Sequence, residues 1–262
     1  MIVLITGIAS GIGKATASLF LNNNHEVYGV DINKVEEENN LHSFVADITN
    51  QEQLLKIKND LENNNTKFDV IINVAGIHKM SSLVEDDYSK LKTVIDINLL
   101  GTILVNRTFH SLLKEKGRII ITTSEVAPLD PMPFNSIYSI SKTALDTYAQ
   151  ALRQELNLIN QKVITIRPGS IKTPLADSSL EGTKLLMEQT ILYKKQSHKF
   201  YNIVRKFMGV PIEPIKIGKL IYKASITKNP KLIYKKHSNI GLILLSILPK
   251  RLQCFIIKTL LK

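Results

Sequence analysis

A glycine-rich turn near the start of the chain constrains the fold more than any other stretch. The β-rich run Ile2–Thr6 leads into the sequence T-G-I-A-S-G-I-G, and a helical pattern follows over Gly11–Leu21. A strand, a tight turn and a helix N-terminus in this order leave backbone N–H groups and a partial positive charge free to meet a phosphate. The stretch therefore predicts a nucleotide-binding turn in an α/β fold rather than a merely structural turn.

Short apolar runs and helical patterns alternate along most of the chain. Such alternation predicts a parallel sheet with helices on both faces, of the doubly wound Rossmann type. No linker or repeat interrupts the pattern, so we expect a single domain over residues 1–262. We expect strands at residues 2–6, 26–31, 43–47, 69–73, 118–123, 162–167 and 231–234, and helices at residues 11–21, 51–61, 87–109, 136–156 and 214–228.

Composition argues against several classes of protein. The single cysteine, Cys254, rules out an internal disulfide and fits a reducing compartment. The six histidines show no metal-ligand spacing, so no metal site is expected. No apolar run approaches the ~20 residues that span a bilayer, and the N-terminus lacks the basic region and cleavage site of a signal peptide. We therefore expect a cytoplasmic protein.

The net charge of +11 is concentrated in the C-terminal part of the chain. Residues 184–262 hold 17 Lys and Arg against 2 Asp and Glu, whereas residues 1–183 hold 17 against 21. This asymmetry indicates either an anionic partner, such as a membrane surface, an acidic substrate or nucleic acid, or a lysine-rich face that is simply solvated. Of these partners we do not expect nucleic acid.

Asp31 ends the second expected strand, where a carboxylate can accept hydrogen bonds from the adenosine ribose of a dinucleotide. The same carboxylate would repel the 2′-phosphate of NADP. Ser10 stands at a position in the glycine turn where an arginine would offset that repulsion. The pair favours NAD over NADP, against the alternative that Asp31 is only the acidic start of a loop.

Tyr138 and Lys142 lie four residues apart in an expected helix whose start is marked by Pro133, Asn135 and Ser136. Positions four apart share a helix face, so the lysine ammonium favours ionisation of the phenol. Moving a tyrosine pKa from ~10 to about 7 needs roughly 4 kcal/mol, which one lysine and a second cation, such as oxidised nicotinamide, could supply together. Alone, the pair also fits a half-buried ring beside a solvated amine.

Several motifs in order resemble the short-chain dehydrogenase/reductase family from about residue 2 to residue 173. They are the turn from Thr6 to Gly13, Asp47-Ile48, Asn73-Val74-Ala75-Gly76, Asn98, Ser124, Tyr138 with Lys142, and Pro168-Gly169 with Thr173. Three departures concern the surroundings of the site: Val74 replaces an asparagine, Glu125 replaces a small residue, and the loop before Tyr138 is proline-rich. The last two put the substrate class in doubt more than the chemistry.

The resemblance implies a set of site residues. Tyr138 would exchange a proton with the substrate oxygen, Ser124 would hydrogen-bond that oxygen, and Lys142 would bind the nicotinamide ribose. Asn98 would relay protons to solvent through its backbone and a water, or act as a helix-kink residue, or both. The implied catalytic residues are Asn98, Ser124, Tyr138 and Lys142, and the implied cofactor contacts are Gly7, Ser10, Gly11, Ile12, Gly13, Asp31, Asp47, Ile48, Asn73, Ala75, Gly76, Tyr138, Lys142, Pro168, Gly169, Ile171 and Thr173.

Beyond Thr173 the sequence is less informative. Residues 175–210 resemble the family's variable substrate lid, and their apolar side chains fit either a hydrophobic substrate pocket or ordinary helix packing. The tail, residues 240–262, has two apolar segments that flank Pro249, Lys250 and Arg251, which predicts two short helices. It could contact a membrane surface peripherally, or pack on the protein's own core or across a dimer. The apolar residues of the lid are Leu185, Leu186, Met187, Ile191, Leu192, Phe200, Tyr201, Phe207 and Met208.

We therefore expect an NAD(H)-dependent oxidoreductase that interconverts a secondary alcohol and a ketone on a hydrophobic small molecule, and that forms a homo-oligomer. The basic, apolar tail is similar to that of relatives acting on steroid-like or retinoid-like alcohols. The alternatives are a reductase of 3-oxoacyl thioesters and, in a different class, a protein that senses NAD(H) without catalysis. The complete Ser-Tyr-Lys set argues against the sensor.

Overall fold

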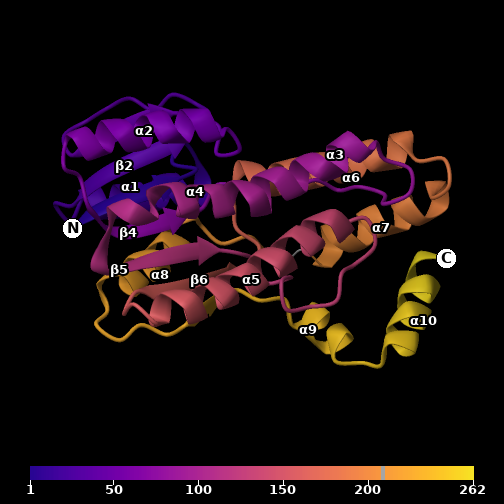
Figure 1. The fold of residues 1–262 in the computed structure, drawn as a ribbon. Coiled ribbons are helices and arrows are strands. Elements are labelled where there is room, and N and C mark those ends of the chain that lie inside the picture. Colours follow the sequence, from indigo (N-terminus) through magenta and orange to yellow (C-terminus); the bar gives the residue numbers. More distant parts are fainter. Residues whose placement is uncertain (208–209) are drawn as a thin grey trace.

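A parallel sheet organises the fold (Figure 1). The computed structural model describes residues 1–207 and 210–262, without the side chains of Asp177, Lys206 and Phe207. Within this part of the chain, seven strands lie in the order β3-β2-β1-β4-β5-β6-β7, and every neighbouring pair is parallel. The strands are β1 (Ile2–Thr6), β2 (Glu26–Asp31), β3 (Leu41–Val45), β4 (Phe68–Asn73), β5 (Leu113–Thr122), β6 (Lys162–Pro168) and β7 (Ile233–Lys236).

Helices cover both faces of the sheet, because successive residues of each buried strand point to opposite faces. Leu4 packs in one apolar cluster with helices α2, α4 and α5, whereas Val3 and Ile5 pack in another with α1 and α8. The helices of the two layers are α2 (Gln51–Asn63), α4 (Thr102–Phe109) and α5 (Ser136–Asn157) on one face, and α1 (Gly11–Leu21) and α8 (Ile215–Ile226) on the other. The predicted doubly wound Rossmann-type architecture is confirmed.

The strand order reverses between β1 and β4, since the chain builds outward from β1 in one direction and then from β4 in the other. In sheets of this kind, ligands bind outside the carboxyl ends of the strands at the point of reversal. The glycine turn follows β1 and Asn73-Val74-Ala75-Gly76 begins at the end of β4, so both flank this point.

The predicted helix over residues 87–109 is not continuous. It consists of α3 (Tyr88–Ile95), a π-helical segment (Asp96–Gly101) and α4. At Gly101 a Cβ atom would lie 2.9 Å from the Ile48 side chain, so this segment approaches the loop after β3 unusually closely. Wider π-helical turns of this kind are frequent at functional sites.

Three strands differ from the prediction by two residues or more at a boundary. β3 begins at Leu41 and ends at Val45, two residues before the predicted bounds, and β7 is displaced two residues the other way. β5 begins at Leu113, because Leu113 pairs with Phe68 across a register irregularity before the regular ladder starts at Arg118. The charged run at Lys114–Lys116 is exposed, and it hid this extension from the apolar pattern. A short 3-10 turn (His110–Leu112) precedes β5.

The segment after β6 forms two further helices, α6 (Pro174–Gln189) and α7 (Lys194–Phe207), which lie together beyond one end of the sheet (Figure 1). Phe200 and Leu186 pack with Phe134, which precedes α5, in a third apolar cluster. The cluster joins α6 and α7 to the proline-rich loop. Of the apolar residues predicted for this segment, Met208 lies outside the described residues, as does the side chain of Phe207.

The C-terminal tail forms two helices that Pro249 separates, as predicted: α9 (Ile240–Ser246) and α10 (Lys250–Leu261). α10 returns towards α7, where Leu261 is buried in the third cluster (Figure 1). Gln253 is buried too, and its amide donates to Asp130 Oδ2 at 2.8 Å and to the Leu248 carbonyl at 2.7 Å. One side of the tail is therefore packed on the protein.

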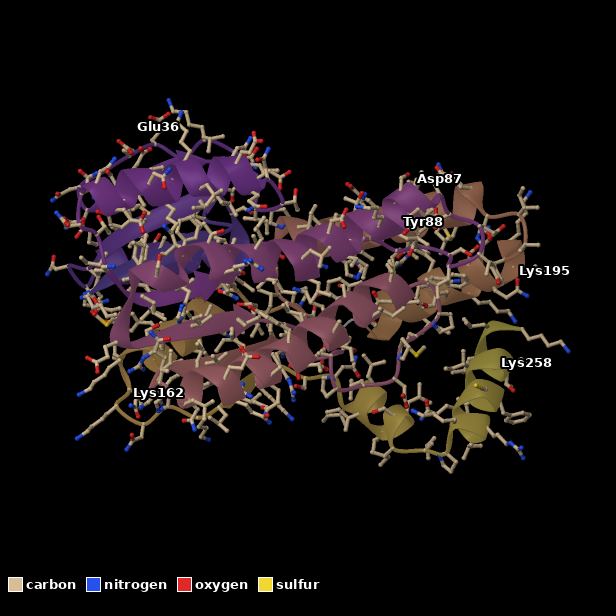
Figure 2. All side chains as sticks on the ribbon, in the orientation of Figure 1. Glu36, Asp87, Tyr88, Lys162, Lys195 and Lys258 are labelled. Carbon is tan, nitrogen blue, oxygen red and sulfur yellow. The ribbon has the colours of Figure 1, made fainter. Side chains whose placement is uncertain are left out.

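The other side of the tail faces outward. Ile240 and Ile247 are each 72% exposed and Phe255 is 65% exposed. Figure 2 shows Lys195 on α7 and Lys258 on α10 projecting from the same end of the molecule. No helix in the described part of the chain is both long and apolar enough to cross a membrane.

Candidate active site

A cavity of about 530 Å³ lies at the carboxyl edge of the sheet, at the point where the strand order reverses. Its walls come from the loops after β1, β2, β3, β4, β5 and β6, from the first turns of α5, and from α6 and α7. Of the residues predicted from the sequence, the cavity is lined by Gly7, Ser10, Gly11, Ile12, Asp31, Asp47, Ile48, Ala75, Gly76, Ser124, Tyr138, Lys142, Pro168, Gly169, Ile171 and Thr173.

The glycine turn closes one end of this cavity. Gly7 has φ +76°, and a Cβ there would lie 2.8 Å from the Ala75 backbone nitrogen. Gly11 has φ +51°, and a Cβ there would lie 2.9 Å from the Thr173 side chain. Only glycine fits either position without strain. α1 begins at Gly11, and its N-cap Ser10 makes no side-chain capping bond, so the first N–H groups of the helix remain available to a phosphate.

Two carboxylates stand at the ends of neighbouring strands in the cavity wall. Asp31 Oδ2 accepts from the Ala9 N–H at 3.0 Å and Oδ1 from the Asn33 N–H at 2.9 Å, which fixes the carboxylate against the glycine turn. Asp47 Oδ1 accepts from the backbone and hydroxyl of Thr49, both at 2.8 Å. The glycine turn and the loop after β2 thus hold Asp31 in one orientation, and the loop after β3 holds Asp47.

Ser124, Tyr138 and Lys142 meet at the other end of the cavity. All three are buried, and the Tyr138 hydroxyl is hydrogen-bonded to Ser124. Lys142 Nζ lies 5.9 Å from the centre of the Tyr138 ring and donates to the Thr122 carbonyl at 3.3 Å. One turn of α5 therefore presents the phenol and the ammonium to the same space, as the spacing of four predicts.

The pKa of Tyr138 differs from the sequence-based expectation. Burial raises it to about 12, the negative charge of Glu125 adds to this rise, and the hydrogen bond from Ser124 opposes it. Burial also lowers the pKa of Lys142 to about 8. The lowering expected from Lys142 together with a second cation is therefore not reached with the chain's own groups, because desolvation of the phenol dominates.

Three predicted residues lie behind the cavity wall. Gly13 packs against the Gly7 carbonyl, where a Cβ would overlap at 1.9 Å. Asn73 is buried, and its amide donates to Asn106 Oδ1 at 2.8 Å. Asn98 lies in the π-helical segment with no exposed surface. These residues support the loops that form the wall rather than line it themselves.

Asn98 ties three parts of the site together. Its Oδ1 accepts from the Ile77 N–H at 2.8 Å, and its Nδ2 donates to the Ile77 carbonyl at 2.9 Å and to Ser141 Oγ at 3.0 Å. These bonds fix the Gly76–Ile77 loop beside α5. A Cβ at Gly76 would lie 3.4 Å from Lys142 Nζ, so the loop that Asn98 holds passes next to the ammonium.

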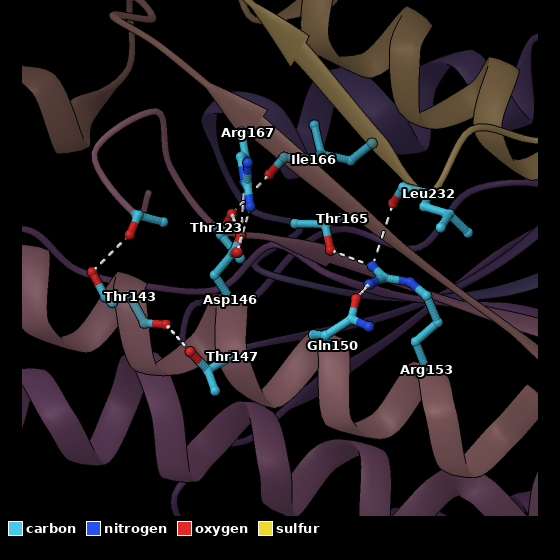
Figure 3. A network of polar contacts seen from close by, with 11 residues as sticks. Thr123, Thr143, Asp146, Thr147, Gln150, Arg153, Thr165, Ile166, Arg167 and Leu232 are labelled. Atoms are coloured by element: carbon cyan, nitrogen blue, oxygen red, sulfur yellow. Dashed lines mark hydrogen bonds and ion pairs between the residues drawn. The ribbon is translucent and has the colours of Figure 1, made fainter. Parts of the chain in front are cut away.

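An ion pair positions α5 against the strands that it crosses. Arg167 on β6 donates twice to Asp146 on α5, and the Thr123 hydroxyl donates to the same carboxylate at 3.1 Å (Figure 3). Two turns later, Arg153 Nη2 donates to Thr165 Oγ1 at 2.8 Å. Because Thr123 directly precedes Ser124, this network links the backbone of the serine to the helix that carries the tyrosine.

Two titratable residues of the cavity wall, His78 and Glu125, were not assigned a role from the sequence. The ring centre of His78 lies 4.3 Å from that of Tyr138, and its Nε2 bonds to Asn135 Oδ1 at 2.8 Å. Burial lowers the His78 pKa to about 4, so the imidazole is neutral at physiological pH. Glu125 also lines the cavity. A single histidine in the loop after β4 gives no sequence signal, whereas Glu125 stood out as a departure from the family pattern.

The sequence predicts N-cap chemistry at Asn135, and the structure confirms the position but not a capping bond. It is the N-cap residue, but its side chain makes no capping bond, because its amide oxygen accepts from His78 instead. The bond fixes the imidazole as the Nε2-protonated form, and it holds the loop after β4 against the start of α5.

The remaining wall of the cavity is largely apolar. Met80 comes from the loop after β4, Leu175 from α6, and Phe200, Ile203 and Val204 from α7. Asn239 and Leu242, at the start of the tail, also line it. No group of three or more potential metal ligands occurs among the described residues.

The fold and the cavity define a protein of the Rossmann-type nucleotide-binding class. The family model for short chain dehydrogenases matches residues 1–184, and the chain belongs to this family. It is therefore an oxidoreductase that acts on CH–OH groups with NAD or NADP.

The chain is similar in sequence or in structure to the following three proteins, among others. A 3-ketodihydrosphingosine reductase of Bacteroides thetaiotaomicron is 27% identical over 87% of this chain and 85% of its own. An NADPH-dependent 1-acyldihydroxyacetone phosphate reductase of Schizosaccharomyces pombe is 30% identical over 79% and 74%. A short chain dehydrogenase of Burkholderia cenocepacia, solved in complex with NADP, has a TM-score of 0.74 at 19% identity and covers all of this chain and 97% of its own.

Proposed function

We propose that the protein interconverts a secondary alcohol and a ketone on a hydrophobic small molecule, with NAD as its coenzyme. The observation that carries the proposal is the joint presence of Ser124, Tyr138 and Lys142 in one desolvated cavity that continues to the glycine turn. The apolar wall from α6 and α7 encloses the same space. We propose residues 175–210 as a substrate lid within a single domain.

In this proposal the glycine turn and the N-terminus of α1 hold the pyrophosphate. Lys142 binds the nicotinamide ribose, while Pro168, Gly169, the backbone of Ile171 and Thr173 hold the nicotinamide end. The bound coenzyme supplies or accepts the hydride. Burial lowers the pKa of Lys142 to about 8 because the charged amine has lost its hydrating water. The ribose hydroxyls would accept hydrogen bonds from the amine in place of that water.

Tyr138 is the proposed proton donor in reduction. With its pKa at about 12 the phenol is protonated at neutral pH, and so it can give its proton to the substrate oxygen as negative charge develops there. Ser124, which is hydrogen-bonded to Tyr138, holds that oxygen from a second direction. In oxidation the phenol must ionise first, and a positive charge beside it would lower the cost.

Asn98 is proposed as a positioning residue. Its side chain is committed to Ile77 and Ser141, so a proton relay would pass through its backbone carbonyl, which the Thr102 hydroxyl contacts at 3.3 Å. Asn98 also holds the Gly76–Ile77 loop beside Lys142 through its bonds to Ile77. It would therefore position this loop whether or not its carbonyl relays protons.

NAD is proposed rather than NADP, because the carboxylate of Asp31 would face the 2′-phosphate of NADP. Among the residues that the structure describes in the cavity wall, none at this end is cationic. Two of the similar proteins are associated with NADPH or NADP, which makes the coenzyme a point for direct measurement.

The substrate is proposed to carry a long hydrocarbon part. A steroid-like or retinoid-like alcohol fits the apolar wall, and so does a linear lipid; the resemblance to a 3-ketodihydrosphingosine reductase supports the linear lipid. A 3-oxoacyl thioester is the second candidate in the same reaction class. A sensor that binds NAD(H) without catalysis would not require the buried Ser124, Tyr138 and Lys142.

We propose that the tail, residues 240–262, contacts an anionic membrane surface peripherally through its outward side, and that the protein is a homo-oligomer. Two observations support the membrane contact: the exposed apolar side chains of Ile240, Ile247 and Phe255, and the +15 charge of residues 184–262. Because Asn239 and Leu242 at the start of the tail line the cavity, such contact would bring a lipid substrate close to its site.

Turnover tests the proposed function. Purified protein with NAD⁺ and a panel of straight-chain, steroid and retinoid secondary alcohols should reduce NAD⁺, followed by absorbance at the nicotinamide band. The reverse reaction with NADH and 3-oxoacyl thioesters tests the second candidate. Tight NAD binding by calorimetry without turnover of any member of the panel would favour the sensor.

A further inference from the structure

Glu125 occupies an unusual position for a carboxylate. It directly follows Ser124 and lines the cavity, and its backbone N–H donates to the Pro168 carbonyl at 2.8 Å. Its charge contributes to the raised pKa of Tyr138, so the carboxylate lies within electrostatic reach of the proposed proton donor. A negative charge there opposes ionisation of Tyr138. Proton transfer alone therefore gives no reason for a carboxylate at this position.

The carboxylate is only partly compensated. Oε2 accepts from the Asn239 N–H at 2.5 Å, whereas Oε1 receives no hydrogen bond from the described residues. Burial raises the pKa of Glu125, while the Asn239 N–H and the charge of His237 oppose the rise. A desolvated carboxylate with spare acceptor capacity is stabilised by a cation that enters its site.

The charges in the cavity wall are divided between its two ends. Among the described lining residues the acids are Asp31, Asp47 and Glu125, and the first two belong to the dinucleotide end. Lys142 is the cation of the described wall, and His78 is neutral because burial lowers its pKa to about 4. Among the described wall residues, Glu125 therefore has no matching cation besides the lysine proposed for the ribose, and His237, whose charge also acts on Glu125, does not belong to the wall.

We propose that Glu125 binds a protonated amino group on a carbon next to the reacting carbon, so that the substrate is a long-chain amino alcohol or amino ketone. The proposal rests on the proposed function, since it places the reacting oxygen at Ser124 and Tyr138. The ammonium pairs with Glu125, the hydrocarbon chain lies along Phe200, Ile203 and Val204, and the ammonium takes no part in hydride transfer.

The same charge distribution disfavours anionic head groups. A phosphate or carboxylate near the reacting carbon would meet Glu125 at short range, and like charges in a desolvated site repel strongly. An ammonium would also offset the effect of Glu125 on Tyr138, because a positive charge near the phenol favours its ionisation. Glu125 would thus select substrates by their charge. Its effect on the Tyr138 pKa would be offset only when an amine is bound.

The main alternative is that Glu125 only fastens the tail through the Asn239 N–H. Glu125→Gln separates the two roles, because the amide keeps an oxygen acceptor for that N–H but removes the charge. Glu85 provides a matched control. Its carboxylate accepts from the backbone N–H groups of Ile191 and Leu192, between α6 and α7, and it does not line the cavity among the described residues.

The experiment compares 2-aminododecan-3-ol with dodecan-3-ol as substrates for NAD⁺ reduction by the full-length protein. We expect the wild type to favour the amino alcohol in kcat/KM by at least about tenfold, mainly through KM. Glu125→Gln should lower the ratio of the two kcat/KM values about tenfold, and Glu85→Gln should leave the ratio unchanged. The wild-type preference should decline as pH rises through the pKa of the amine.

Equal kcat/KM values for the two alcohols in the wild type would overturn the proposal, and so would an unchanged ratio in Glu125→Gln. Calorimetry of the same pair with NAD⁺-saturated Tyr138→Phe protein provides a readout without turnover. If neither alcohol is oxidised but the amine still binds through Glu125, the proposed function fails and the ammonium site stands. If both are oxidised equally, the ammonium site fails alone.

Discussion

Arg167 on β6 donates two hydrogen bonds to Asp146 on α5, from Nε to Oδ1 at 2.9 Å and from Nη2 to Oδ2 at 2.5 Å (Figure 3). The Thr123 hydroxyl adds a third bond to Oδ1. Since Thr123 precedes Ser124 and α5 carries Tyr138, one carboxylate fixes the relative position of the two proposed reacting groups. The bidentate geometry is the strongest form of such a pair.

Replacing Asp146 with asparagine should lower both stability and turnover. The side chains of Arg167 and Asp146 are only 11% and 19% exposed, so the variant leaves a guanidinium largely desolvated and unpaired. We expect a loss of about 2 kcal/mol in the free energy of unfolding, below the roughly 3–5 kcal/mol of a fully buried pair. Chemical denaturation measures the first effect, and kcat with saturating NAD⁺ measures the second.

A matched control is the exposed pair of Lys34 and Glu36, whose side chains are 76% and 91% exposed. Glu36→Gln should leave the denaturation midpoint unchanged, because water already screens this pair. If Asp146→Asn behaves like Glu36→Gln in both measurements, the ion pair does not position the site.

Most of the sheet could be predicted from the sequence, because buried parallel strands are continuous apolar runs and the glycine turn is locally encoded. The prediction was least accurate where tertiary contacts set the backbone. The π-helical segment at Asp96–Gly101 responds to a close approach by Ile48 that no periodicity reveals. The polar start of β5 depends on the pairing of Leu113 with Phe68, two residues that are distant in sequence.

In the candidate site, too, local features could be predicted from the sequence, whereas features set by tertiary contacts could not. Spacing alone could place Tyr138 and Lys142 on one helix face, but it could not give the sign of the tyrosine pKa shift. That sign depends on burial, which raises the Tyr138 pKa more than the surrounding groups lower it. His78 and Asn135 come together from different loops, and only the folded chain reveals that a predicted cap residue binds an imidazole.

Tyr138→Phe should retain NAD binding and lose turnover by several powers of ten, because only the hydroxyl that exchanges a proton is removed. Calorimetry with NAD⁺ and kcat on the best alcohol of the panel provide the two readouts. A variant with more than about a tenth of the wild-type kcat, a cost below ~1.4 kcal/mol in the barrier, would show that another group exchanges the proton.

Lys142→Met should make the protein more stable at neutral pH while it removes activity. Burial lowers the Lys142 pKa from 10.5 to about 8, so folding carries a penalty for the charged amine of about 3 kcal/mol below pH 8. Between pH about 8 and about 10.5 the unfolded chain binds a proton that the folded chain has released, and wild-type stability therefore rises with pH. The methionine variant lacks this dependence.

Denaturation midpoints of the two proteins from pH 6 to pH 10 test this prediction. The advantage of Lys142→Met should be constant below pH 8 and should shrink as pH rises towards 10. An advantage that is independent of pH would come from packing rather than from the buried charge. A variant less stable than the wild type at pH 7 would contradict the assignment of a desolvation penalty to Lys142.

Asp31→Ser should shift coenzyme preference from NAD towards NADP by at least about tenfold in the ratio of dissociation constants, because a carboxylate beside the 2′-phosphate is removed. The change also releases the Ala9 N–H that Asp31 binds, so the affinity for both coenzymes can fall, and the ratio is the informative quantity. Calorimetry with NAD⁺ and NADP⁺ measures it.

Asp47 provides a matched control for Asp31, since it also follows a strand and lines the cavity but belongs to the neighbouring strand. Asp47→Ser should leave the preference between NAD and NADP unchanged. Wild-type protein that binds NADP more tightly than NAD would contradict the role of Asp31 directly.

The outward side of the tail should bind anionic vesicles. Ile247 and Phe255 are exposed on the two tail segments, and each buries apolar surface if the tail lies in a lipid interface. We expect full-length protein to co-sediment with vesicles of phosphatidylglycerol and phosphatidylcholine at low salt, and less so in 0.5 M salt, because exposed charges are screened. Phosphatidylcholine vesicles alone should retain less protein.

Point variants test this better than truncation, because Gln253 and Leu261 are packed on the protein and their removal would disturb it. Replacing both Ile247 and Phe255 with aspartate should weaken vesicle binding at least about tenfold. The charge-matched control is Lys162→Glu, which also changes the net charge by −2 but at a site distant from Lys258 on the tail (Figure 2). If the control weakens vesicle binding as much as the double variant, only the net charge of the protein determines binding. Full-length wild-type protein that stays in the supernatant at low salt with both kinds of vesicle would rule out membrane contact by the tail.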